Sequence, residues 1–193
     1  MNEFWLYFKL GLYHVLDWNA YDHILFLVVL TAAYSFKSWK RVFILVSIFT
    51  LGHTLSLFLS AYNVISVNGR VVEFLIPLTI FASAVFNIFT AGKPVQNQKV
   101  NVLMVTTIFF GLIHGLGFSS YFKTINAGSG SKLMPLIEFA LGIELAQIIV
   151  VVIILMLSYV IQTVFRFSLR DWVLVVSSIV LGMVIPMLAS NWI

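Results

Sequence analysis

The sequence contains no cysteine and very few charged residues, and each shortage excludes a class of protein. Of its 193 residues, 9% are charged and 61% are hydrophobic. Soluble domains have about 25% charged and about 45–50% apolar residues. Without cysteine there is no disulfide, thiolate metal site or cysteine nucleophile. The composition therefore predicts an integral membrane protein whose main partner is the lipid bilayer, and the net charge of +4 is interpreted as a determinant of topology, with no nucleic acid bound.

Several motifs of soluble and membrane enzymes are also missing. There is no glycine-rich phosphate loop, no G-x-S-x-G serine elbow and no H-E-x-x-H zinc motif. The last apolar segment contains no lysine, which excludes a retinal Schiff base there. The chemistry of the protein must therefore come from side chains that lie far apart in the sequence.

Seven apolar segments follow one another with short connections. They cover approximately residues 4–16, 22–36, 41–62, 71–91, 101–122, 136–165 and 172–190. A helix needs about 20 mainly apolar residues to cross the ~30 Å hydrocarbon core. The segments predict an all-α integral membrane protein, a compact bundle of about seven transmembrane helices with a short first helix. Residues 1–193 are expected to form a single transmembrane domain.

The lysines and arginines between the segments alternate in number. Seven lie after the second, fourth and sixth segments, namely Lys37, Lys40, Arg41, Lys93, Lys99, Arg166 and Arg170. Three lie in the alternate loops, namely Arg70, Lys123 and Lys132. Because cytoplasmic loops contain an excess of Lys and Arg, the first set is expected in the cytoplasm. With seven crossings, this predicts the N-terminus inside and the C-terminus outside, in a bacterial inner membrane.

All four histidines lie inside or beside apolar segments, and several carboxylates accompany them. An ionisable side chain in the membrane costs about 2.5–3.5 kcal/mol on insertion scales and usually marks a functional site. Helical rise places these residues at a similar depth, in the outer half of the bilayer. Neutral imidazole and carboxylate suit divalent nickel, cobalt or zinc. The predicted metal ligands are His14, Asp22, His23, His53 and His114.

A second set of polar residues is predicted to line a metal path or to orient the ligands. It comprises Asp17, Glu73, Glu138, Glu144, Gln147 and Ser56. Offsets of three place Ser56 on the same helix face as His53, and Gln147 on the same face as Glu144. The plainer explanation for any one of these residues is a hydrogen bond between helices. Asp22 also has an alternative, as a helix cap or as a partner that orients a neighbouring imidazole.

At these residues the sequence resembles the HupE/UreJ family of small membrane proteins, which is linked to nickel supply for hydrogenase and urease. The matching pieces are His14…Asp22-His23, the octapeptide FTLGHTLS at 49–56, FGLIHGLGF at 110–118 and EFALGIELAQ at 138–147. The resemblance implies a bundle of six to seven helices and metal permeation. Seven residues separate His14 from Asp22, where the family usually has five, and this leaves open whether Asp17 shares the role of His14.

Three functions fit these observations. The first is a transporter or permease for a divalent transition metal, with nickel the leading ion and cobalt or zinc next. The second is an intramembrane zinc-dependent hydrolase, in which three histidines hold a metal-bound water and a glutamate acts as base. The third is a metal sensor or accessory protein that binds without transporting. We expect transport rather than catalysis, and a homo-oligomer is compatible with the sequence.

Overall fold

The computed structural model describes residues 3–18, 20–93, 100–126 and 131–192. These residues form seven α-helices and a short 3₁₀ helix, and contain no strand. The elements are α1 (Glu3–Leu16), α2 (Asp22–Ala32), η1 (Phe36–Ser38), α3 (Trp39–Ala61), α4 (Gly69–Thr90), α5 (Val100–Ile125), α6 (Leu133–Thr163) and α7 (Leu169–Ser190). The all-α prediction is confirmed, and each helix lies close to a predicted apolar segment.

Five helical stretches are long and apolar enough to cross a membrane. They are Phe36–Ala61, Gly69–Thr90, Leu103–Ile125, Leu133–Thr163 and Leu169–Ser190. Large apolar side chains are exposed along them, as expected for helices that face lipid. The protein is therefore an integral membrane protein. Helices α2, α4 and α6 terminate at one end of the bundle, which we call the basic face. Helices α3 and α5 terminate at the other end, which we call the opposite face.

The first two helices are too short to cross alone. α1 has 14 residues and α2 has 11, or about 21 Å and 16 Å at 1.5 Å per residue. Ring contacts with α5 show that they follow one another across the bundle. The ring centroids are 6.3 Å apart for Tyr7–Phe122, 4.2 Å for His14–Phe118, 5.3 Å for His23–His114 and 6.0 Å for Phe26–Phe110. Together α1 and α2 thus form one interrupted pass antiparallel to α5.

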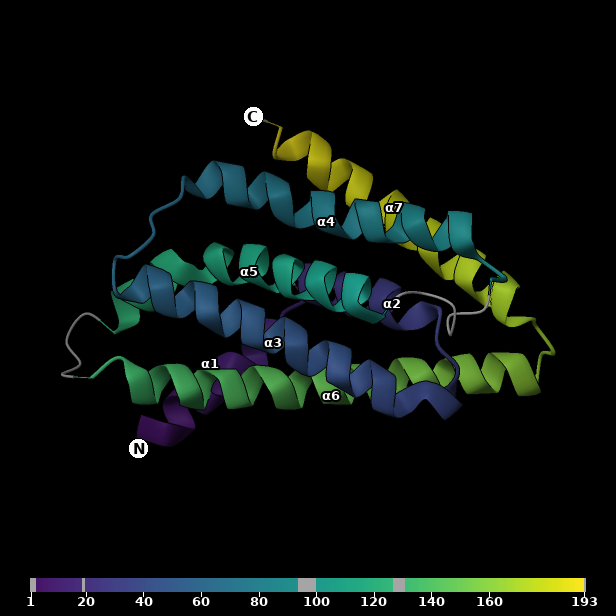
Figure 1. Cartoon of the computed structure of the whole chain (residues 1–193), viewed down its shortest axis with the longest axis horizontal. Coiled ribbons are helices and arrows are strands. Elements are labelled where there is room, and N and C mark those ends of the chain that lie inside the picture. Colours follow the sequence, from purple (N-terminus) through teal and green to yellow (C-terminus); the bar gives the residue numbers. More distant parts are fainter. Residues whose placement is uncertain (1–2, 19, 94–99, 127–130, 193) are drawn as a thin grey trace.

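This arrangement corrects the predicted topology. The chain passes six times between the two ends of the bundle, because α1 and α2 share one pass. Figure 1 shows α1 starting at the opposite face, where Tyr7 contacts Asn126 at the end of α5. The chain ends there too, since Trp192 packs 5.6 Å from Phe74 near the start of α4. Both termini therefore lie on one side, and the predicted placing of the N-terminus across the membrane from the C-terminus does not hold.

The α3–α5 crossing is a backbone contact made possible by glycines. A Cβ added at Gly52 would collide with the carbonyl oxygen of Ile108, and one at Gly111 with that of Phe49. Gly115, one turn further along α5, is equally close to the backbone of His53. Small residues allow such close approach between membrane helices. The crossing fixes the backbone around His53 against the segment of α5 that contains His114.

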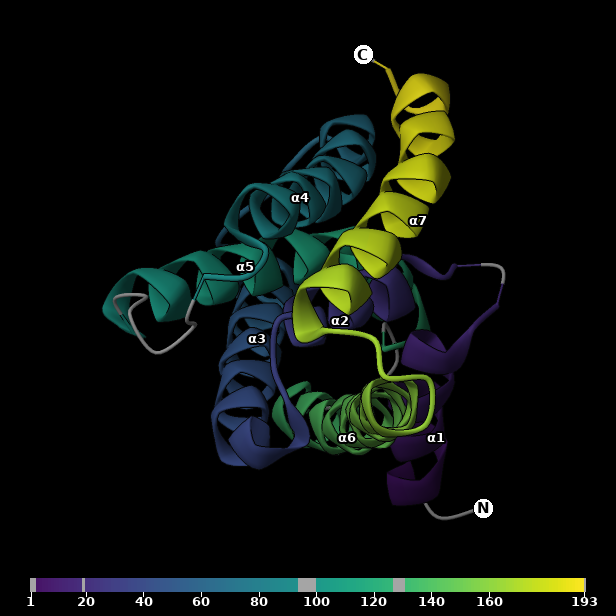
Figure 2. The ribbon, with the colours of Figure 1, turned by 90° about the vertical axis from the view of Figure 1, so that its right-hand side faces the viewer.

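A second glycine pair joins α1 to α6. A Cβ added at Gly11 would collide with the carbonyl oxygen of Phe139, and one at Gly142 with that of Phe8. This contact attaches the short first helix to the longest helix of the bundle. In the end-on view, α2 lies near the middle, with α3, α5, α4, α7, α6 and α1 around it (Figure 2). The end of α1 and the start of α2 therefore meet inside the bundle at His14 and His23, whereas Asp17, Trp18 and Ala20 of their connection are exposed.

We predict that reporters fused to either end of the chain indicate the same side of the membrane, and that this side is the outside. The first part follows from the six passes. The second follows from the excess of Lys and Arg at the basic face. Alkaline phosphatase and fluorescent-protein fusions measure both. Reporters that place the two ends on opposite sides would contradict the interrupted pass.

The glycine crossing gives a stability prediction. Gly111→Ala should destabilise the bundle by about 1–3 kcal/mol, since the methyl group must push α3 and α5 apart. Gly182 on α7 is the matched control, because a Cβ there meets nothing within 4 Å. Gly182→Ala should be neutral or stabilising by up to ~1 kcal/mol. Thermal unfolding in detergent measures both, and equal unfolding midpoints would rule out a tight α3–α5 contact.

Candidate metal centre

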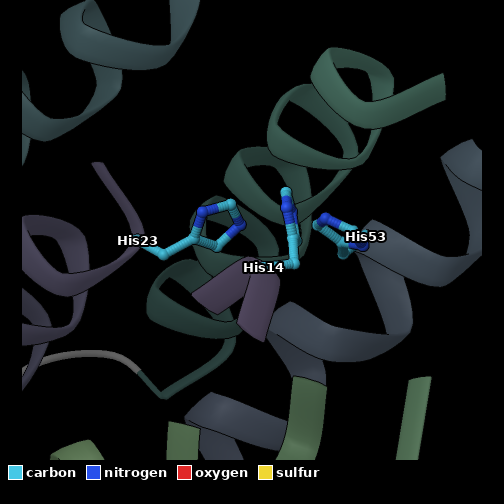
Figure 3. A group of neighbouring side chains, drawn as sticks. All are labelled: His14, His23 and His53. Atoms are coloured by element: carbon cyan, nitrogen blue, oxygen red, sulfur yellow. The ribbon is translucent and has the colours of Figure 1, made fainter. Parts of the chain in front are cut away.

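Four imidazole rings from four helices meet at the break between α1 and α2. His14 ends α1, His23 begins α2, and His53 and His114 lie midway along α3 and α5. Figure 3 shows the first three grouped, each entering from its own helix. The ring centroids are 4.6 Å apart for His14–His23, 5.7 Å for His14–His53, 5.7 Å for His23–His53 and 5.3 Å for His23–His114. We call these four residues the histidine cluster.

The cluster is buried and short of hydrogen bonds. His23, His53 and His114 are 3%, 0% and 1% exposed, and His14 is half-buried. Five ring nitrogens are buried without a hydrogen-bond partner among the described residues: Nε2 of His14, Nε2 of His23, Nδ1 and Nε2 of His53, and Nδ1 of His114. Buried polar atoms in native proteins are nearly always hydrogen-bonded. So many unpaired nitrogens in one place indicate a ligand-binding site.

Asp22 orients the ring of His23. Its Oδ1 lies 3.1 Å from Nδ1 of His23 and accepts a hydrogen bond from the backbone N–H of the same residue at 2.8 Å. A carboxylate can only accept, so Nδ1 carries a proton, and a metal-binding ring would offer the other nitrogen. Nε2 is then left with a free lone pair. Carboxylate partners fix metal-binding histidines in this way.

Thr79 on α4 orients the ring of His114. The hydroxyl of Thr79 donates to the carbonyl oxygen of Ile76 at 2.7 Å and lies 3.2 Å from Nε2 of His114. Because the single hydroxyl proton is used by the carbonyl, Nε2 of His114 must be the donor to Thr79. The lone pair of His114 is therefore on Nδ1. Two independent partners thus leave one free nitrogen on each of two rings.

The cluster contains two overlapping groups of ligand atoms. One nitrogen each of His14, His23 and His53 lie within 4.8 Å of one another, and so do one atom each of Asp22, His23 and His114. His23 belongs to both groups. Neutral imidazole with a carboxylate is a donor set suited to nickel, zinc and copper(II). The residues present therefore fit a divalent transition metal ion.

Aromatic side chains surround the imidazoles and separate them from lipid and water. Phe118 packs 4.2 Å from His14, and Phe139 stacks on Phe118 at 4.8 Å. On the other side, Phe49 and Phe26 both lie 5.2 Å from His114. In such a low-dielectric shell a cation interacts more strongly with its ligands than it would in water.

A second polar group lies next to the cluster between α3 and α6. Ser47 donates to Oε1 of Glu144 at 2.5 Å, and Thr50 donates to Oε2 of the same carboxylate. Thr50 also lies 2.9 Å from the side-chain oxygen of Gln147. Thr50 precedes His53 by three residues, or about 4.5 Å toward the basic face. We call these four residues the Glu144 branch.

The remaining predicted site residues lie in different environments. Asp17 and Glu73 are exposed and belong to neither ligand group. Glu138 is half-buried, with Oε2 buried and without a hydrogen-bond partner. Ser56 donates to the carbonyl oxygen of His53 at 3.0 Å. Of the two residues considered for the first motif, His14 belongs to the histidine cluster, and Asp17 is exposed and outside both ligand groups.

Thr79 and Ser47 were not among the predicted residues. Thr79 starts a polar stripe on α4 that continues with Ser83 and Asn87 at intervals of four residues. This four-residue spacing is visible in the sequence and indicates a polar face on the helix. Ser47 has a similar signal, since it lies three residues before Thr50 on the polar stripe that includes His53 and Ser56, but only the contact between α3 and α6 brings it to Glu144.

The comparison with protein families decides the membership of the chain. The family model described as HupE / UreJ protein matches residues 1–192. The chain belongs to the HupE/UreJ family. The resemblance seen in the sequence is therefore confirmed over essentially the whole chain of this HupE/UreJ protein. Searches of curated proteins and of solved structures give no match.

We predict that Thr79→Val weakens metal binding by this HupE/UreJ protein by about 10–100-fold, the usual effect of removing a partner that orients a ligand. Valine keeps the shape but cannot accept from Nε2 of His114. Isothermal titration with Ni²⁺ measures the change. Thr90→Val is the control, because Thr90 on the same helix bonds only to backbone carbonyls of its own helix. Equal losses in the two variants would show that Thr79 does not act through His114.

Proposed function

We propose that this protein transports a divalent transition metal ion across the membrane, with nickel the leading cargo and cobalt or zinc next. The observation that carries the proposal is the convergence of five buried, unpaired imidazole nitrogens at the break between α1 and α2. Membership of the HupE/UreJ family favours nickel. The Lys and Arg distribution favours a cytoplasmic position for the basic face in a bacterial inner membrane.

In this proposal the ion is cargo and the histidine cluster binds it on its way. His14, His23, His53 and His114 supply neutral nitrogens, and Asp22 supplies one negative charge. Transporters commonly bind ions near the middle of the membrane where a helix is interrupted. The break between α1 and α2 has that character. The half-buried Glu138, within two turns of the start of α6, is proposed to attract the ion from the opposite face.

One observation favours transport over the hydrolase alternative. Asp22, the carboxylate in the ligand groups, is engaged by the backbone and ring of His23, and Glu144 is engaged by Ser47 and Thr50. Neither is poised over a metal-bound water as a general base must be.

The Glu144 branch is proposed as the next site on the path from the histidine cluster to the basic face. A carboxylate at this depth is costly unless a cation or a proton visits it. Two hydroxyl groups donate hydrogen bonds to this carboxylate. An ion that leaves His53 needs to move only about one helical turn to reach it. In this role Glu144 accepts either the metal ion or a counter-transported proton.

We expect purified protein in proteoliposomes to conduct Ni²⁺ or Co²⁺ down an imposed gradient, and His53→Ala and His114→Ala to lose both binding and flux. An encapsulated metal-sensitive dye measures flux, and titration measures binding. Parent protein that binds metal but conducts none of nickel, cobalt or zinc would refute transport. A metal sensor or a hydrolase would then be the better assignment.

The Glu144→Gln variant distinguishes transport of the ion from binding alone. It should largely spare Ni²⁺ binding, because Glu144 belongs to neither ligand group, but it should abolish flux. Glu73→Gln is the matched control, since Glu73 is the exposed glutamate of α4, and it should change neither quantity. Weakened binding without a specific loss of flux would mean that Glu144 only balances the charge of a resting ion.

A further inference from the structure

A large cavity lies between α2, α4 and α5 on the basic-face side of the histidine cluster. Its volume is about 470 Å³. Phe26 and Phe110 line the end near the histidine cluster, and Asn87 and Leu103 line it further toward the basic face. Phe110 and Leu103 both lie in α5 and are seven residues apart, or about 10 Å at helical rise. The cavity therefore extends from the level of the cluster toward the basic face.

One aromatic ring separates this cavity from the ligands. The ring of Phe26 lines the cavity, and its centroid is 5.2 Å from that of His114. It is held in place by stacking on Phe49 at 4.6 Å and by edge contact with Phe110 at 6.0 Å. Phe26 is only 2% exposed. An apolar ring in this position is a barrier to water and ions, of the kind that closes channels by excluding water.

Polar groups lead from the cluster into the cavity along one face of α4. Thr79 contacts His114, and Ser83, one turn on, donates to the carbonyl oxygen of Thr79 at 2.8 Å. Asn87, one turn further, donates to the carbonyl oxygen of Val29 at 2.7 Å. Ser83, Asn87 and Thr107 line the cavity. Water occupies a cavity only where such partners exist, and this volume holds about 15 molecules at ~30 Å³ each.

We propose that the cavity is a water-filled vestibule through which the metal ion leaves the histidine cluster toward the basic face, and that Phe26 is its gate. The inference rests on the proposed function, transport. It adds a route and a gating residue that the ligand set alone does not supply. Fifteen waters are enough to rehydrate a divalent ion, which usually has about six in its first shell. Rotation of a single side chain would join the cluster to that water.

The vestibule and the Glu144 branch have different tasks in this scheme. The vestibule contains no carboxylate among its described lining residues, so it gives the hydrated ion a neutral path without a second binding site. Because the metal ion leaves through the vestibule in this scheme, Glu144 keeps the second of its two proposed roles, the acceptance of a counter-transported proton between α3 and α6. Metal and proton would then leave the cluster by separate routes.

The first test uses the natural absence of cysteine. Ser83→Cys introduces one thiol in the cavity, and Val105→Cys introduces one on α5 at a 65% exposed position that does not line it. A charged, membrane-impermeant thiosulfonate is added to the basic face of oriented vesicles. Ser83→Cys should react many times faster than Val105→Cys, because thiolate forms in water and not in hydrocarbon. Equal, slow labelling would show a dry or lipid-filled cavity and overturn the vestibule.

The second test changes the gate and the route. Phe26→Ala should raise Ni²⁺ flux several-fold while Ni²⁺ binding persists, and Ser83→Phe should reduce flux by filling the cavity. Phe122→Ala is the control for lost packing, since Phe122 is equally buried but lies toward the opposite face. It should leave flux within about twofold of the parent.

The outcomes separate the two proposals. Parent flux that neither Phe26→Ala nor Ser83→Phe alters, in variants that still bind Ni²⁺, overturns the vestibule and leaves transport intact. No flux in the parent overturns transport and the vestibule with it. If Phe26→Ala does not fold, the labelling of Ser83→Cys decides alone, because it retains Phe26.

Discussion

The close approach of helix backbones at glycines is the constraint on which the rest of the structure depends. At the α3–α5 crossing, Gly52 and Gly111 each face a carbonyl of the other helix, and Gly11 and Gly142 do the same for α1 and α6. Helices that meet backbone to backbone have little freedom to slide or rotate. Three of the four imidazoles lie within three residues of these glycines. The geometry of the centre is therefore determined by contacts that contain no ligand atom.

Burial of the histidine cluster without a bound ion would be costly. A buried polar atom without a hydrogen bond costs about 1–3 kcal/mol, and the cluster contains five such nitrogens. A divalent cation bound there, as proposed, would remove much of this cost. In the absence of the ion, the cost has to be offset by packing in the bundle. The phenylalanines around the imidazoles, Phe26, Phe49, Phe118 and Phe139, provide it.

The helices and the candidate ligands could be predicted from the sequence because both depend on local sequence patterns. Apolar runs indicate spanning helices, and His53 and His114 stand out because imidazole is rare in such runs. The number of membrane passes could not be predicted, because the sequence of residues 4–16 indicates a short helix whether or not that helix crosses the membrane. Only contacts between α1 and α5, such as that of His14 with Phe118, reveal the direction. The spacing on α4 marks Thr79 as part of a polar stripe, but its role depends on which imidazole it contacts, and only the structure shows that this is His114.

The attachment of α1 to α6 has a consequence for the order of assembly. During synthesis, residues 3–16 leave the ribosome long before Gly142, the residue against which Gly11 packs. A 14-residue helix cannot span the bilayer, and its final position does not exist until α6 has been inserted. The first segment made is therefore among the last to be placed. Of the two groups of candidate ligands, the one that contains His14 is therefore completed only after α6 is in place, whereas Asp22, His23 and His114 can come together without α1.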